Sequence, residues 1–261
     1  MAEGTVVTSR EGAVGVIELA RPEKFNAINR ATFTAMVAAM EAFEAEGSGI
    51  RAVLIRAQGR NFCTGGDLVE AQSMEGDSAA LAEYLAFMNG ALTRLEASPL
   101  PVVCACQGLV LAGGLEIALA CDVVFAADTA RFGDQHVHYG LIPGWGATQR
   151  LVHQAGLRRA LDLMFSGRWL DAQTAGAWGI VNHVVPADDL AEAAMAYCAT
   201  LASRSRPGLA AMKALARAAG DLPLDEGLRL ETARTVQIME GPDPAEGIRA
   251  FLDRRRPRFG G

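Results

Sequence analysis

The sequence lacks the features that mark secreted, membrane-spanning or zinc-binding proteins. Its five cysteines are an odd number and form no C-x-x-C pair, which argues against a disulfide framework or a zinc cage. The apolar stretch 101–127 is interrupted by Gln107, Glu116 and Asp122, so it never reaches the roughly 18 unbroken apolar residues of a membrane helix. The N-terminus has neither the basic start nor the apolar segment of a signal peptide. We therefore expect a cytoplasmic protein without a membrane partner.

Several catalytic motifs are also missing. The chain contains no G-x-x-x-x-G-K-[ST], no G-x-S-x-G and no H-E-x-x-H, and it shows no dinucleotide fingerprint. Its 24 Lys and Arg against 30 Asp and Glu give a net charge of −6, so we expect no nucleic-acid partner. With 51% hydrophobic residues, the chain has ample material for a large core.

Apolar periodicity predicts a mixed α/β core followed by a helical region. Short β-rich or apolar runs that predict strands occur at 14–19, 52–56, 102–106 and 123–126. Helical patterns occur at 31–46, 78–97, 113–120 and 147–165, with loops at 58–66 and 132–146. From 187 onward the pattern is helical throughout, with helices predicted at 187–203, 207–219, 225–239 and 244–253.

Glu116 is the first candidate for chemistry. It is the only charged residue between Glu96 and Asp122, and its neighbours are apolar. A carboxylate in such a run must be paired or hydrogen-bonded, and a perturbed buried carboxylate suits acid–base catalysis. A helix dipole that stabilises an acidic residue in the first turn explains the same residue without catalysis.

Two glycine pairs precede predicted helices, Gly65-Gly66 and Gly113-Gly114. Glycine lets a ligand approach the backbone, and the free N–H groups of a helix start can stabilise a developing oxyanion. Each pair taken alone also fits an ordinary turn.

His136 and His138 lie two residues apart in the predicted loop 132–146. On an extended segment they would point the same way. No third ligand stands at a recognisable spacing, so we predict no metal. A general acid or base and a histidine that only packs both remain open for this position.

Four segments resemble the crotonase superfamily, also called the enoyl-CoA hydratase/isomerase family. They are 21–28 (RPEKFNAI), 61–68 (NFCTGGDL), 107–122 (QGLVLAGGLEIALACD) and 132–150 (FGDQHVHYGLIPGWGATQR). The end, 250–259 (AFLDRRRPRF), is similar to the family's closing helix. The resemblance spans nearly the whole chain in order.

The resemblance implies an α/β fold with a spiral core of ββα units and a C-terminal all-helical region that builds trimers. We place the acyl-CoA-binding core at 1–198 and the oligomerisation region at 199–261. A homotrimer, or a hexamer made of two trimers, is expected. No metal or redox cofactor is implied, because coenzyme A enters as part of an acyl-CoA thioester substrate.

Carried over position by position, the family's oxyanion hole consists of the N–H groups of Gly66 and Gly113. Both belong to the glycine pairs described above. The resemblance implies five substrate-binding residues, which are Lys24, Phe25, Ala27, Asp67 and Trp145. The adenine end of CoA is expected near 24–27, and a neighbouring subunit's Arg254 or Arg256 is expected near its phosphates. Trp145 departs from the family's G-x-G-G pattern and is expected to narrow the acyl pocket.

The resemblance implies two catalytic glutamates around one water. One matches Glu116, whereas the other position holds His136, preceded by Gln135 instead of proline. Neutral histidine can accept a proton near working pH but lacks the carboxylate's charge. The expected reaction is reversible hydration of a 2-enoyl-CoA to a 3-hydroxyacyl-CoA. Open alternatives are double-bond isomerisation, decarboxylation or C–C hydrolysis through the same enolate, and a CoA-binding subunit with weak catalysis.

Overall fold

A six-stranded sheet forms the centre of the protein in the computed structural model, which describes residues 4–260. Its order is β1-β2-β3-β4-β6-β9. The strands are β1 (Val6–Glu11), β2 (Val14–Leu19), β3 (Ala52–Ala57), β4 (Val102–Cys106), β6 (Val123–Ala127) and β9 (His183–Val185). Only β1 runs antiparallel to its neighbour. All four predicted strands are confirmed, whereas β1 and β9 were not predicted. The exposed pattern of β1 explains its weak signal, because five of its six residues face solvent.

A second, smaller sheet is built from the strands that follow the main ones. It contains β5 (Leu109–Leu111), β7 (Arg131–Gly133) and β8 (Leu170–Asp171). Two isolated bridges, Ile28–Gly66 and Cys63–Val110, extend this layer toward the start of the chain. Successive turns of the chain therefore add one segment to each layer and then a helix, which is the predicted spiral of ββα units.

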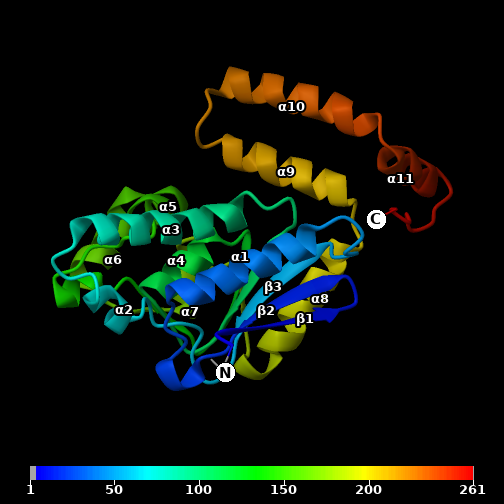
Figure 1. Cartoon of the computed structure of the whole chain (residues 1–261). Helices are drawn as coiled ribbons and strands as arrows, with labels where there is room; N and C mark the ends of the chain where they lie inside the picture. Colours follow the sequence, from blue (N-terminus) through cyan, green and yellow to red (C-terminus); the bar gives the residue numbers. More distant parts are fainter. Residues whose placement is uncertain (1–3, 261) are drawn as a thin grey trace.

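Helices enclose the sheets. The core contains α1 (Arg30–Glu44), α2 (Leu68–Gln72), α3 (Ser78–Glu96), α4 (Gly113–Ala120), α5 (Ala147–Ala155), α6 (Leu157–Ser166), α7 (Ala172–Ala177) and α8 (Leu190–Ala202). The side chains of Asn29 and Asp77 cap α1 and α3 by accepting hydrogen bonds from first-turn N–H groups. Helix α8 packs against β2, β3, β4 and β6, while α1 and α3 lie together on the other side (Figure 1).

Three local predictions were wrong. The single helix predicted at 147–165 is broken at Gly156, whose φ of +84° and ψ of 153° lie outside the helical region, giving α5 and α6. The predicted loop 132–146 contains the end of β7 and a short 3-10 helix, η2 (His136–Tyr139). The predicted helix 187–203 opens with the 3-10 turn η3 (Ala187–Asp189) before α8.

The C-terminal helices project from the core (Figure 1). They are α9 (Arg206–Ala218), α10 (Leu224–Met239) and α11 (Pro242–Leu252), which confirms a helical region after 187. None of the residues of α10 is buried, and large apolar side chains stay exposed on all three helices. The predicted boundary after 198 falls within α8, and residues 1–3 and 261 of the two predicted regions lie outside the described residues. Within 4–260, no helix is long and apolar enough to cross a bilayer.

Candidate active site

The two glycine turns meet beside one indole ring. A Cβ added to Gly113 would lie 2.2 Å from Cζ3 of Trp145, and one added to Gly66 would lie 3.2 Å from its Cζ2. At Gly65, whose φ is +121°, an added Cβ would lie 3.6 Å from the backbone nitrogen of Gly113. Glycine is therefore required at 113 by close packing, and the turns predicted from sequence lie against each other.

Each glycine pair contains a backbone N–H group that is not engaged in a hydrogen bond within 4–260, at Gly66 and at Gly113. Neither of them donates a hydrogen bond to any residue in 4–260, whereas the neighbouring Asp67 N–H donates to the carbonyl of Ile28. Gly113 is the first residue of α4, where the backbone N–H has no partner within the helix. Two such donors side by side can hold one oxygen that gains negative charge.

Glu116 lies in the first turn of α4 and is buried, with a side chain that is 1% exposed. Its Oε1 accepts hydrogen bonds from the backbone nitrogens of Trp145 (2.8 Å) and Ala147 (3.0 Å). Burial raises the pKa of Glu116 to about 7, although the two N–H donors and the nearby His136 oppose the rise. A carboxyl group with this pKa exchanges protons readily near neutral pH.

His136 is held by Asp134, a neighbour whose side-chain direction could not be predicted from the sequence. Its Nδ1 lies 3.0 Å from Oδ1 of Asp134, and its backbone nitrogen lies 3.3 Å from the same oxygen. Burial alone would lower the pKa of His136, but the hydrogen bond and charge of Asp134, with the charge of Glu116, raise it above the usual value. Glu116, His136 and Asp134 therefore form one electrostatic cluster.

The two histidines of this segment have different environments. Gln135 has a left-handed backbone, and η2 follows it, so the segment is not extended. Nε2 of His138 lies 3.0 Å from the carbonyl oxygen of Gly167, away from the partner of His136. Among the residues that the structure describes, no three or more His, Cys, Asp or Glu side chains are grouped to hold a metal ion.

The residues predicted to bind CoA gather around Arg21. Its guanidinium donates to the carbonyl of Ala27 (2.7 Å) and pairs with Asp67 (2.9 Å). Lys24 ends the 3-10 helix η1 (Pro22–Lys24), and Phe25 follows it with a φ of +52° and an exposed ring. The structure thus brings Ala27 and Asp67 together through Arg21, beside the exposed Lys24 and Phe25, whereas Trp145 lies against Gly66 and Gly113.

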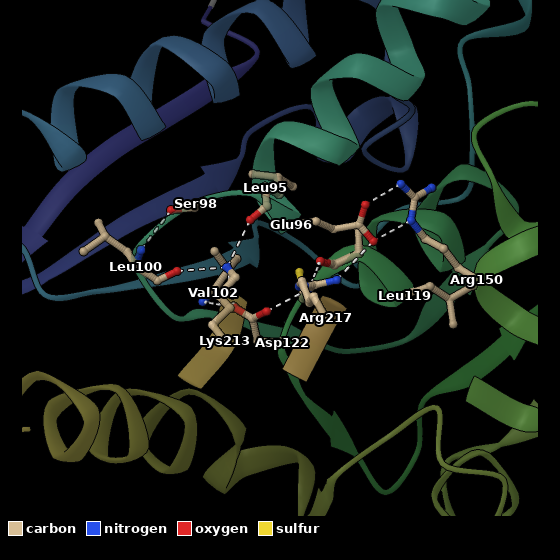
Figure 2. A network of polar contacts seen from close by, with 12 residues as sticks. Leu95, Glu96, Ser98, Leu100, Val102, Leu119, Asp122, Arg150, Lys213 and Arg217 are labelled. Carbon is tan, nitrogen blue, oxygen red and sulfur yellow. Dashed lines mark hydrogen bonds and ion pairs between the residues drawn. The ribbon is translucent and has the colours of Figure 1, made fainter. Parts of the chain in front are cut away.

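Trp145 forms a wall of the site. Its indole is buried and packs edge-to-face on Phe33, with ring centroids 5.4 Å apart. Its carbonyl accepts a hydrogen bond from Arg150 (2.7 Å), and Arg150 is fixed in turn by Glu96, as the network in Figure 2 shows. The loop that positions Glu116 is therefore anchored to α3.

Comparison with known proteins agrees with this fold. The family model described as enoyl-CoA hydratase/isomerase matches residues 9–261. A Rhizobium meliloti protein named "Probable enoyl-CoA hydratase" is 33% identical over 99% of both chains. The crystal structure of an enoyl-CoA hydratase from a Polaromonas species superposes with a TM-score of 0.94 at 29% identity, covering 98% of this chain and 99% of that one. One from Bacillus anthracis gives 0.91 at 29% identity, covering 98% of both chains. The chain belongs to the enoyl-CoA hydratase/isomerase family.

Three residues that support the candidate site are not among the predicted site residues. Asp134, Arg21 and Phe33 all contact a predicted site residue. The sequence gives the two-residue spacing of Asp134 and His136. The direction of the two side chains is set by the turn between them, which the sequence did not predict. Phe33 carried only the signal of a core residue in a helix.

Proposed function

We propose that this protein catalyses the reversible addition of water across the 2,3 double bond of a 2-enoyl-CoA. The observation that carries the proposal is the pair of unpartnered N–H groups at Gly66 and Gly113, set in one site with Glu116 and His136. The named relatives support the reaction class. Such donors bind the thioester oxygen more tightly as it gains charge, so they favour the transition state over the substrate.

Each proton transfer is assigned to a group by its hydrogen bonds. Two N–H groups favour the anionic form of Glu116, and a carboxylate favours the protonated form of His136. Glu116 accepts a proton from water as the water oxygen bonds to C3. The π electrons move toward C2 and the thioester oxygen, giving an enolate held by Gly66 and Gly113. His136 then donates a proton to C2, and solvent restores both groups.

The acyl-CoA ligand is assigned to the loop around Arg21. The exposed Lys24 and Phe25 offer a charge and an aromatic face to the adenine end. Trp145 narrows the space beside the oxyanion donors, which favours short acyl groups. We assign no metal or redox cofactor a role in this reaction.

The proposal includes a homotrimer or a hexamer of two trimers. The apolar side chains on α9–α11 support it, because such surfaces usually meet another subunit. Arg254 and Arg256 are exposed near the C-terminus and form no ion pair within 4–260, in contrast to Arg255, which pairs with Glu246. They are therefore available to a neighbouring subunit's CoA phosphates. The five free, buried cysteines support a cytoplasmic location.

A second enolate reaction has one observation in its favour. His136 stands where the resemblance predicts a glutamate, so the two proton-transfer groups differ in charge from a pair of carboxylates. Isomerisation, decarboxylation and C–C hydrolysis use the same oxyanion donors, and the product separates them from hydration.

The test is incubation of the full-length protein with a series of 2-enoyl-CoA thioesters in D₂O, read by mass spectrometry. Hydration gives a 3-hydroxyacyl-CoA that carries one non-exchangeable deuterium at C2. The Glu116→Gln variant is the control for adventitious turnover. Recovery of every enoyl-CoA without added water or deuterium would refute hydration, and a shifted, deuterated alkene would favour isomerisation.

A further inference from the structure

Asp134 is a buried charge with half of its hydrogen-bonding capacity unused. Its side chain is 1% exposed. Oδ1 accepts from the Nδ1 and backbone nitrogen of His136, while Oδ2 has no hydrogen-bond partner within 4–260. Because a buried carboxylate is costly when it is poorly paired, its presence calls for a reason beyond folding.

Within 4–260, Asp134 is the only hydrogen-bond partner of the His136 ring. Glu116 faces it from α4 at electrostatic range, and no hydrogen bond between the two is present in the described residues. Cys63 also faces Glu116, but burial raises the pKa of its thiol to about 12, so the thiol stays neutral. His138 bonds the carbonyl of Gly167 instead. The ring of His136 is thus fixed at Nδ1, and no residue in 4–260 bonds its Nε2.

We propose that Asp134 is the positioning residue for His136: it keeps a proton on Nδ1 and presents Nε2 to the space shared with Glu116. The role of Nε2 as the acid for C2 rests on the function proposed above, whereas the orientation of the ring does not. The proton leaves and returns at Nε2 while the Nδ1 proton stays on the Asp134 hydrogen bond, so the cycle balances without a net transfer to Asp134. A carboxylate behind a histidine in this way selects one tautomer and stabilises the imidazolium.

The test compares the wild type with Asp134→Asn by NMR of ring-labelled histidine. The chain has four histidines, and a His136→Gln variant assigns the signal of residue 136. In the wild type, neutral His136 is expected as the Nδ1–H tautomer. In Asp134→Asn its pKa is expected to fall by about one pH unit or more, since a charge at hydrogen-bond distance is lost. The neutral amide no longer favours one tautomer. If hydration is the reaction, kcat is expected to fall about 10²-fold, in the range of one acid–base group, with KM within twofold.

A matched control is Asp171→Asn. Asp171 likewise accepts a backbone hydrogen bond, from Thr174 at 2.7 Å as the N-cap of α7, but it is exposed and does not contact His136. This variant is expected to leave the His136 signals and kcat unchanged.

An unchanged tautomer and pKa of His136 in Asp134→Asn would overturn the proposal whatever the activity. If that variant does not fold, the wild type alone decides, because an Nε2–H tautomer of neutral His136 would also overturn it. The NMR changes in a protein without hydratase activity would support the role of Asp134 and refute the proposed function, so the two failures are distinguishable.

Discussion

Two clusters of charged side chains lie inside this protein, and they are completed to different degrees. The first joins α3, α5 and α9 to Asp122, which lies between α4 and β6 (Figure 2). Glu96 binds Arg150 and Arg217, and Asp122 binds Arg217 and Lys213, at distances of 2.7–3.2 Å. We call these five residues, Glu96, Asp122, Arg150, Lys213 and Arg217, the linking network. Each of its carboxylate oxygens lies within ion-pair distance of an arginine or lysine nitrogen.

The second cluster, at the candidate active site, is left incomplete. Glu116 uses only Oε1 and Asp134 only Oδ1, so each has an oxygen without a partner in 4–260. Two carboxyl groups share a single histidine here. Both carboxylates of the linking network are paired at both oxygens, although Nε of Arg217 has no partner within 4–260. Each carboxylate of the candidate site, in contrast, keeps one oxygen without a partner there. Buried atoms without a partner also occur away from the site, at Arg51 and Asp243, so the candidate site is distinguished by unpaired carboxylate oxygens that stand beside a carboxyl group of raised pKa, Glu116.

The largest expected effect separates activity from stability at the site. Glu116→Gln keeps an acceptor for the N–H groups of Trp145 and Ala147 but removes the proton acceptor. We expect kcat to fall by about 10²–10⁴-fold, as for loss of a general acid or base. Thermal stability should stay the same or rise, because a buried charge is gone. A loss of activity below about tenfold would contradict the catalytic role.

In the linking network, we expect a substitution to lower stability and to leave activity nearly unchanged. The Nζ of Lys213 meets Asp122 and the carbonyls of Leu95 and Leu100, and its side chain is only 9% exposed. Lys213→Met is expected to lower the free energy of unfolding by about 3 kcal/mol, since Asp122 loses a buried partner. Activity per folded molecule should stay within twofold. Urea denaturation followed by circular dichroism measures the change.

Arg229→Met is the matched control for this experiment. Its ion pair with Asp225 is a pair on the exposed surface of α10, with both side chains about 70% exposed. It is expected to change stability by less than about 0.5 kcal/mol. Equal effects of the two variants would show that the linking network contributes no more than a surface pair.

A third variant tests the wall of the site. Trp145→Gly removes the indole that packs against Gly66, Gly113 and Phe33. We expect the ratio of kcat/KM for bulky over short enoyl-CoA substrates to rise by about tenfold or more, as for added room in an apolar pocket. Steady-state rates over a series of chain lengths measure this ratio, and an unchanged profile would remove Trp145 from the pocket wall.

The smallest expected effect is the response to pH. The acid limb follows Glu116, whose pKa is about 7, so kcat/KM is expected to fall about fivefold from pH 7 to pH 6 as the carboxylate takes up a proton. The alkaline limb follows His136, whose pKa Asp134 raises, as the imidazolium is lost. His136→Gln should remove the alkaline limb and retain the acid limb. A profile that lacks the acid limb would contradict the assignment of Glu116 as base.

The alternation of strands and helices could be predicted from the sequence because the buried strands and amphipathic helices carry strong periodic patterns, whereas the spiral of ββα units was implied by the family resemblance. The periodic patterns missed β1, whose residues are mostly exposed, and the short strands of the second sheet, which are too brief for a pattern. Glu116 could be predicted as a candidate site residue because it is a single charged residue in an apolar run. The contact between Asp134 and His136 could not be predicted, because it depends on the left-handed backbone of Gln135 and the turn after it.

The backbone at Ala112 limits how this enzyme can be stabilised. Ala112 stands just before Gly113 with a φ of +47° and a ψ of −116°, a conformation that suits glycine and costs other residues about 1–3 kcal/mol. Its methyl group occupies the space that a side chain at Gly65 would need, at 3.1 Å. The strained backbone thus lies directly before Gly113 and against Gly65, where the two glycine turns meet. Selection for stability alone would replace Ala112 by glycine, and it would thereby remove the methyl group that lies between the two glycine turns.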